Sequence, residues 1–386
     1  MAKSERPRRR LVIGLIVLAF VIGLLAVFSI WVKRQALETD NWVDTSAKLL
    51  EDEEISDQLA LYLVDQLYAN IDVQAEVAAA LPPRLQPLAG PIAGGIRQAA
   101  DRGAKNLLDR PKAEQLWEDA NRNAHERFVT VIDGDAPDDD ITISLATVVQ
   151  ALGDQIGVDV ADRLPPDTAE LVVIPASDLS NVQDAVKLFK DLVIVLAVLA
   201  LGLFALAVYL ARGWRREALR DVGFAFIAIG IAVLALRSLG GGVVAGSLAT
   251  TTSVEPAAQN AWTIGTSLLS EGAGAMIFYG LAIIFGAWLA GPGRVASGLR
   301  RSLTPLFRDP SVAYPTLLVL LLVLFWWAPT EGFRRLPISI LIIALLVGGF
   351  ELLRRKAIRD FPDETWEKTS ERWRKSGPFG RRASGD

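Results

Sequence analysis

The residues that first suggest chemistry are five carboxylates in one short segment. Asp133, Asp135, Asp138, Asp139 and Asp140 all lie within eight consecutive positions, 133–140. Clustered carboxylate oxygens are ligands that Ca²⁺ prefers, so the segment is a candidate metal site. It lacks the Gly at the sixth position and the Glu at the twelfth position of an EF-hand loop. A solvated acidic turn is therefore the favoured interpretation, with Ca²⁺ binding as the alternative.

His125 is the one histidine of the chain, and cysteine is absent. Thiol catalysis, iron–sulfur clusters, cysteine-based zinc sites and disulfides are therefore excluded. A Ser-His-Asp triad would need His125, and nothing near it resembles a nucleophile elbow. A lone histidine beside the apolar line of a helix favours a structural role. We expect no catalytic residue, no cofactor and no enzymatic activity.

Four ionisable residues lie near the ends of long apolar segments: Asp191, Arg237, Glu271 and Glu351. A charge at membrane depth is a candidate functional group, because its burial in hydrocarbon is costly. The first three are expected at the outer side and Glu351 near the inner side, where water and headgroups reach them. Interfacial or locally paired charges are the favoured interpretation. A transport path is the alternative, although no relay of charges occurs at mid-span.

The C-terminal segment combines cations with indoles: Arg354, Arg355, Lys356, Arg359, Trp366 and Trp373. This pattern is typical of contact with an anionic inner leaflet, with indoles at the acyl boundary. A stop-transfer charge cluster with a disordered end is the alternative.

Six apolar segments must position these groups. We expect spans at 11–32, 192–211, 222–236, 273–290, 312–327 and 336–353. The first follows a basic tail, 1–10, and has no small-x-small cleavage site, so it is interpreted as a retained anchor. The 51% content of hydrophobic residues and the mean hydropathy of +0.32 are high for a soluble protein of 386 residues.

The distribution of Lys and Arg predicts the orientation. These residues gather in 1–10, 212–220, 294–308 and the tail 354–386, whereas 239–271 has none. Arg334 and Arg335, in a short outer loop, depart from the pattern. By the positive-inside rule both termini are cytoplasmic, which predicts a multi-pass plasma-membrane protein. Residues 33–187 are then extracytoplasmic and 188–353 form the membrane domain.

Residues 33–187 are acidic, and most of them show helical periodicity. The predicted apolar lines are Ile55-Leu59-Leu63-Leu67, Ile92-Ile96-Ala99-Gly103-Leu107 and Leu116-Ala120-Ala124-Phe128-Val131. Ile141–Leu145 and Leu171–Ile174 predict two strands instead. In the outer loop 240–270, a helix from Ser253 is expected to lie along the outer interface. The predicted fold class is an all-α membrane protein: a six-helix transmembrane bundle with a mostly helical extracytoplasmic domain containing a small two-stranded β element.

Four segments resemble a group of actinobacterial multi-spanning membrane proteins: Glu38–Ser46, Tyr62–Leu67, Leu81–Arg84 and Gly286–Pro292. The Arg-, Ala- and Leu-rich, Lys-poor composition is similar too. The resemblance extends from the first anchor to near Arg359 and implies the family and its host group. It implies no activity and transfers no catalytic residue.

The function expected from the sequence is that of a non-enzymatic integral membrane protein of the cell envelope. Its extracytoplasmic domain is expected to bind a partner protein, a lipid or a second copy of the chain. A transporter or channel with a path between the helices is the alternative, and a sensor is a weaker third hypothesis. The lipid bilayer is an expected partner. A nucleic acid is not, because basic residues are confined to membrane-adjacent stretches.

Overall fold

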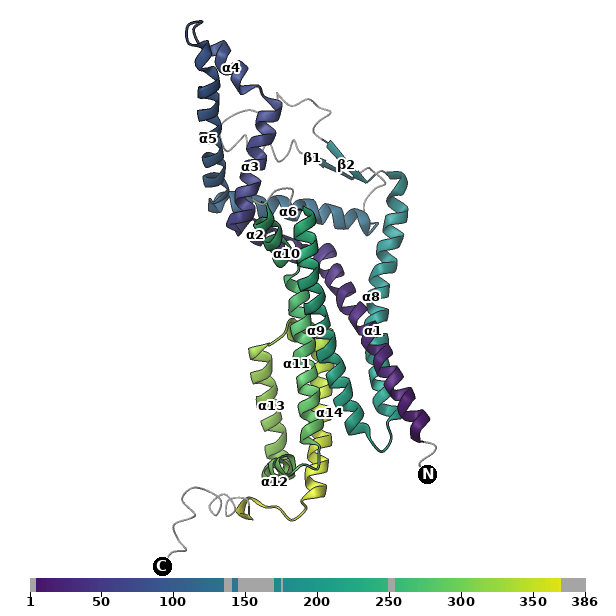
Figure 1. The fold of residues 1–386 in the computed structure, drawn as a ribbon. Coiled ribbons are helices and arrows are strands. Elements are labelled where there is room, and N and C mark those ends of the chain that lie inside the picture. Colours follow the sequence, from purple (N-terminus) through teal and green to yellow (C-terminus); the bar gives the residue numbers. More distant parts are fainter. Residues whose placement is uncertain (1–4, 135–140, 145–169, 175, 249–253, 369–386) are drawn as a thin grey trace, which may run out of the picture. The chain divides into compact units, whose positions relative to one another are not determined.

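A computed structural model describes residues 5–134, 141–144, 170–174, 176–248 and 254–368, and the fold is described for these alone. Almost all of them are helical (Figure 1). The helices are α1 (Glu5–Leu37), α2 (Thr39–Glu51), α3 (Glu53–Asn70), α4 (Val73–Ala80), η1 (Gln86–Leu88), α5 (Ala89–Leu108), α6 (Pro111–Ile132), α8 (Ala176–Leu210), α9 (Arg215–Leu248), α10 (Glu255–Gly265), α11 (Ser267–Leu289), α12 (Arg294–Arg308), α13 (Pro310–Trp327), η4 (Glu331–Arg334) and α14 (Leu336–Asp360).

Six of these helices are long and apolar enough to cross a membrane. They comprise Arg8–Leu37, Ser180–Leu210, Arg215–Ser247, Ser267–Leu289, Pro310–Trp327 and Leu336–Asp360. Each contains one predicted apolar segment or most of it, so the six candidates agree in place with the six predicted segments. The described part of the chain has the character of a multi-pass membrane protein. Some helices are longer than a bilayer's hydrocarbon core is thick: α9 has 34 residues. At 1.5 Å per residue it is about 50 Å long, against a hydrocarbon core of about 30 Å.

The fold class is corrected to an almost wholly helical structure, because strand pairing is limited to one short antiparallel pair among the described residues. The backbone of Ile141–Ser144 (β1) runs antiparallel to that of Glu170–Ile174 (β2), with a register irregularity between Ile141 and Thr142. Among the described residues no third strand joins this pair. An isolated two-stranded ladder is marginally stable at best. Helix packing, not sheet formation, therefore holds the described structure together.

Contacts divide the chain into two compact units, each described by itself. Unit 1 comprises 1–25, 197–234 and 271–386, and unit 2 comprises 26–196 and 235–270. Unit 2 therefore adds the connection between the third and fourth spans to the helices of the predicted extracytoplasmic domain. Periodicity within single helices gives no sign of this long-range grouping.

Glycines determine how closely α9 and α11 approach in unit 1. A Cβ atom on Gly280 would lie 2.7 Å from the carbonyl oxygen of Gly223, and one on Gly223 would lie 2.9 Å from the carbonyl oxygen of Gly280. Gly230 lies as close to the backbone of Ala273. Small residues at such crossings allow two membrane helices to gain backbone contact. No larger residue fits at these points without displacing a helix.

Tryptophan side chains organise unit 2. The Trp117 Nε1 atom of α6 donates to the carbonyl oxygen of Ser46 in α2, at 2.9 Å. The indole of Trp262 in α10 lies against Gly240 and Gly241, and its Nε1 donates to the carbonyl oxygen of Arg237 at 3.0 Å. The absence of side chains at these glycines makes room for the indole. The helix α9 therefore continues through a glycine run that the sequence analysis took as the start of a loop.

The short helix α10, which begins close to the predicted start at Ser253, is docked on protein. The Asn260 Nδ2 group donates to both carboxylate oxygens of Asp52, at 3.1 and 2.9 Å, and to Glu54 at 3.2 Å. These acceptors lie at the junction of α2 and α3. The contact ties α10 to the junction of α2 and α3 within unit 2.

Candidate functional site

The predicted acidic metal site is only partly described. Asp133 ends α6, and its carboxylate pairs with Lys190 of α8. Gln183 supports the same junction by donating from Nε2 to the carbonyl oxygen of Val131, at 2.8 Å. Asp135, Asp138, Asp139 and Asp140 lie outside the described residues. Within the described residues no group of three metal-ligating side chains occurs. Calcium binding there stays a prediction.

The four charged residues near the span ends are not gathered into one site. Arg237 donates from Nε to Thr266 Oγ1 at 2.8 Å and from Nη2 to the carbonyl oxygen of Thr263 at 3.0 Å. Glu351 pairs with Arg355 at 2.7 Å and with Arg354 at 3.3 Å. Asp191 and Glu271 are exposed. Arg237 and Glu351 are thus held in local bonds of their own units.

The predicted inner-leaflet residues divide into two groups. Arg354 and Lys356 bond to protein, because they donate to the carbonyl oxygens of Phe307 and Ala290. These two cations satisfy carbonyls near the ends of α12 and α11, where helices leave acceptors unpaired. Arg355, Arg359 and Trp366 are exposed, and Trp373 lies outside the described residues. Among the described residues of this set, Arg355, Arg359 and Trp366 present their side chains to the surrounding medium.

His125 is a buried structural residue of unit 2, only 5% exposed. Its Nε2 atom lies 3.2 Å from the carbonyl oxygen of Ala36, and its Nδ1 atom lies 3.0 Å from Thr39 Oγ1. A carbonyl can only accept, so Nε2 carries the proton and the Thr39 hydroxyl donates to Nδ1. Burial lowers the pKa of His125 below its usual value. The ring also stacks on Trp42, with centroids 5.1 Å apart. It joins α6 to the α1–α2 junction and carries no sign of a catalytic role.

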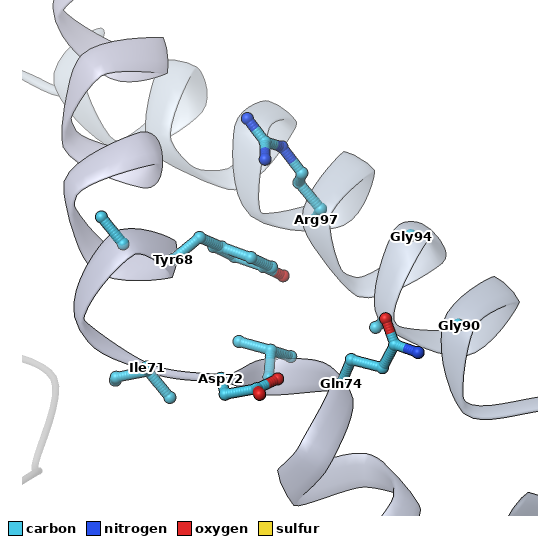
Figure 2. Close-up of a pocket in the computed structure, with 10 residues that line it drawn as sticks. Tyr68, Ile71, Asp72, Gln74, Gly90, Gly94 and Arg97 are labelled. Carbon is cyan, nitrogen blue, oxygen red and sulfur yellow. The ribbon is translucent and has the colours of Figure 1, made fainter.

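The candidate functional site is a groove between the two arms of a helical hairpin, α3–α4 on one side and α5 on the other (Figure 2). Its volume is about 380 Å³. Most of the lining residues are apolar or glycine, and four have polar side chains. The lining residues are Tyr68, Ala69, Ile71, Asp72, Val73, Gln74, Gly90, Ala93, Gly94 and Arg97. Gly90, Ala93 and Gly94 of α5 have little or no side chain, so they leave the helix backbone accessible from the groove. Asp72 is engaged as the N-cap of α4, accepting from the backbone N–H of Ala75 at 2.9 Å.

One polar group of the groove is left unsatisfied. The hydroxyl of Tyr68 is buried, and it has no hydrogen-bond partner in the described structure. The Arg97 guanidinium lies 5.5 Å from the centroid of the Tyr68 ring and pairs with Asp65. A buried hydroxyl without a partner costs about 1–3 kcal/mol, and each such group in a native structure needs an explanation. A bound molecule that offers a hydrogen-bonding group would remove this cost.

The same hairpin exposes a line of large apolar side chains. Leu88, the last residue of η1, and Ile92 and Ile96 of α5 recur every fourth residue and are 49%, 39% and 44% exposed. The buried residues of α5 are instead Ala89 and Ala93. The sequence analysis placed Ile92 and Ile96 on a line with the spacing of a buried helix face. The structure buries the alanine side of the helix and leaves the isoleucine side exposed.

The chemistry of the groove follows from its few polar side chains. The groove contains one carboxylate, which caps a helix, and it contains neither the histidine nor a second acid. Acid–base chemistry needs a proton donor or acceptor placed against a substrate. The groove was not predicted from the sequence, because its two walls come from helices that a proline-rich turn separates. One signal was available: Gly90 and Gly94 occur in the same helix as the isoleucine line, a combination that is unusual for a core helix.

No family model, curated protein or solved structure matches this chain.

Proposed function

We propose that the protein is a non-enzymatic integral membrane protein of the cell envelope, and that its extracytoplasmic domain binds a partner through the α3–α4–α5 hairpin. The partner is a protein, a lipid or a second copy of the chain, and it presents an apolar surface. The proposed setting is the plasma membrane, with both termini in the cytoplasm. The distribution of Lys and Arg supports this orientation, and the resemblance to actinobacterial membrane proteins supports the host group.

The observation that carries the proposal is the exposed line Leu88, Ile92 and Ile96 at the end of η1 and in α5, neither of which is a membrane-span candidate. Lipid-facing spans expose apolar side chains because hydrocarbon surrounds them. That reason does not apply to α5, which has too many polar residues to cross a bilayer. Contiguous apolar surface on a water-exposed element marks an interaction site.

The groove supplies the specific part of the interaction. The unsatisfied hydroxyl of Tyr68 can donate to or accept from one polar group of the partner. The apolar line supplies burial, at about 25 cal/mol per Å² of apolar surface removed from water. Such a combination, a mostly apolar surface with few polar groups, is typical of binding sites.

Native mass spectrometry of the full-length protein in nanodiscs, extracted from its own host membrane, tests the proposal. The variant Ile92→Ser/Ile96→Ser removes the apolar line. Its matched control, Gln98→Ser/Arg102→Ser, places the same two changes at exposed polar positions of the same helix. We expect a bound protein, lipid or second copy on the wild type and the control, and a loss of at least tenfold in the bound fraction of the isoleucine variant.

Tyr68→Phe provides a second, independent measurement. Without a partner, removal of the unsatisfied hydroxyl leaves the thermal stability unchanged or raises it. With the partner bound, the same change removes a hydrogen bond and weakens binding. Equal retention of the partner by the wild type, the isoleucine variant and Tyr68→Phe would refute the proposal. A homo-oligomer that survives all these changes would direct attention to the spans, and flux in liposomes would then test transport.

A further inference from the structure

The helix α12 has an arrangement that the extracytoplasmic function does not use. Its 15 residues, Arg294–Arg308, connect the fourth span, which ends at Leu289, to the fifth, which begins at Pro310. In Figure 1 α12 is seen nearly end-on beside the lower ends of α13 and α14, which belong to the same unit and are seen along their length. A helix that lies crosswise at the ends of two spans lies at a membrane surface.

The rotation of α12 about its axis is fixed by its buried side. Arg300 is 3% exposed and donates from Nη1 to the carbonyl oxygen of Gly291 at 2.6 Å and from Nη2 to Asp360 at 3.1 Å. The aromatic ring of Phe307 packs against that of Phe350 in α14, with centroids 5.3 Å apart. These contacts hold one side of α12 against α14. The directions of its other two sides follow from helical geometry.

The second side of α12 is apolar and open. Val295 and Leu299 are four residues apart and therefore neighbours on the helix surface, and they are 71% and 39% exposed. Leu306, seven residues beyond Leu299, continues the same side and is half-buried. Ser302 lies between them on this side, and its hydroxyl is satisfied within the helix by the carbonyl oxygen of Gly298, at 3.1 Å. If water surrounded this side of the helix, the exposure of its apolar side chains would be unfavourable.

The third side is basic. Arg294, Arg301 and Arg308 are spaced seven residues apart and form one line along the helix. Arg301 pairs with Glu364 at 2.7 Å, and Arg308 donates to the carbonyl oxygen of Pro362 at 3.0 Å. Arg294 is exposed. An apolar side and a separate arginine side on one helix are typical of helices that lie in the membrane interface.

We propose that α12 is an interfacial helix that seats the Val295–Leu299 side at the acyl boundary of the bilayer and holds the arginine side at the level of the headgroups and water. The occupant of the apolar side is the lipid surface, not a protein, because both ends of α12 are tied to spans. Fewer than two dozen residues connect those spans, so α12 stays at the depth where the two spans end. That depth is where acyl chains meet headgroups.

Site-directed spin labelling of the full-length protein tests this inference, and the absence of native cysteine makes single-cysteine variants directly usable. Val295→Cys and Leu299→Cys probe the apolar side, and Ser297→Cys is the matched control on the side of the arginines. Each variant carries a nitroxide in nanodiscs that hold one chain per disc, made of phosphatidylcholine and phosphatidylglycerol. Collisions with oxygen report exposure to lipid, and collisions with a water-soluble nickel chelate report exposure to water.

We expect the labels at positions 295 and 299 to collide readily with oxygen and to be shielded at least fivefold from the nickel chelate relative to position 297. Their depth should be about 5–10 Å below the phosphates. Nickel accessibility at 295 and 299 equal to that at 297 would overturn the inference. Shielding of 295 and 299 from both probes would also overturn it, because protein would then cover this side. If one variant fails to fold, the other probes the same side.

Discussion

Replacing the buried histidine His125 by Phe should weaken unit 2 by a calculable amount. The phenyl ring keeps the volume and the stacking on Trp42, whose ring centroid lies 5.1 Å from that of the imidazole. It removes both ring nitrogens, and with them the hydrogen bonds to the carbonyl oxygen of Ala36 and to Thr39 Oγ1. The acceptor of Ala36 lies in the last turn of α1, where a helix has no backbone donor to offer.

The expected loss follows from these two bonds. A hydrogen bond contributes about 0.5–1.5 kcal/mol net, so His125→Phe should cost about 1–3 kcal/mol of local stability. Thr39→Val removes only one of the two bonds and should cost about half as much. The stability loss of the double variant should be smaller than the sum of the two single losses by about 1 kcal/mol, because each single change already removes the Thr39–His125 bond.

The pH dependence gives the same reasoning a second test. Burial holds the pKa of folded His125 below its value in the unfolded chain, about 6.5. The unfolded state therefore binds more protons in the interval between the two values, so this contribution to stability is complete above pH 6.5. It is lost as the pH falls toward the folded pKa. Its slope approaches about 1.4 kcal/mol per pH unit, the limit for one proton.

Hydrogen exchange measured by mass spectrometry on the full-length protein in nanodiscs reports these quantities, once corrected for the intrinsic effect of pH. Peptides that cover 36–46 and 117–130 should exchange roughly tenfold to hundredfold faster in His125→Phe than in the wild type at pH 8. The difference should shrink between pH 6.5 and pH 5, because only the wild type loses the histidine contribution. Equal exchange at pH 8, with the same pH slope in both proteins, would refute the assignment of His125 as a neutral, hydrogen-bonded bridge.

Three further predictions concern helix contacts. Gly280→Ala should destabilise unit 1 by about 1–3 kcal/mol, because its Cβ would lie 2.7 Å from a backbone oxygen of α9. Thermal denaturation should show no loss for Gly274→Ala, where the space is open, and a loss there too would contradict the packing argument. Gly241→Leu should expel the indole that lies against that residue, which a red shift in tryptophan fluorescence would report; an unchanged spectrum would oppose this. Asn260→Ala should release α10 from Asp52 at a cost of about 1.5–3 kcal/mol, since the acceptor is charged. We expect faster hydrogen exchange that is confined to residues 255–265. Unchanged protection of these residues would contradict the prediction.

The candidate site shows where local patterns stop being sufficient. The sequence alone places Ile92 and Ile96 on one apolar line with helical spacing. The structure leaves this line exposed and buries Ala89 and Ala93 on another side of the same helix. Periodicity gives the lines along a helix, but the partner helix decides which line is covered. The groove and its unsatisfied Tyr68 hydroxyl follow from that choice, so neither was predictable from one helix alone.

The sequence by itself determined the properties that depend on short stretches of chain. Six long apolar segments identify six spans because the cost of exposing them to water adds up residue by residue, whatever surrounds them. The missing cysteine and the lone histidine exclude classes of chemistry for the same local reason. Only the tertiary structure decided what distant segments do together. It carried α9 through its glycine run because Trp262 fills the space beside it, and it docked α10 on Asp52. The reason is that a close contact exists only when both partners are in place, and no local pattern records the second partner.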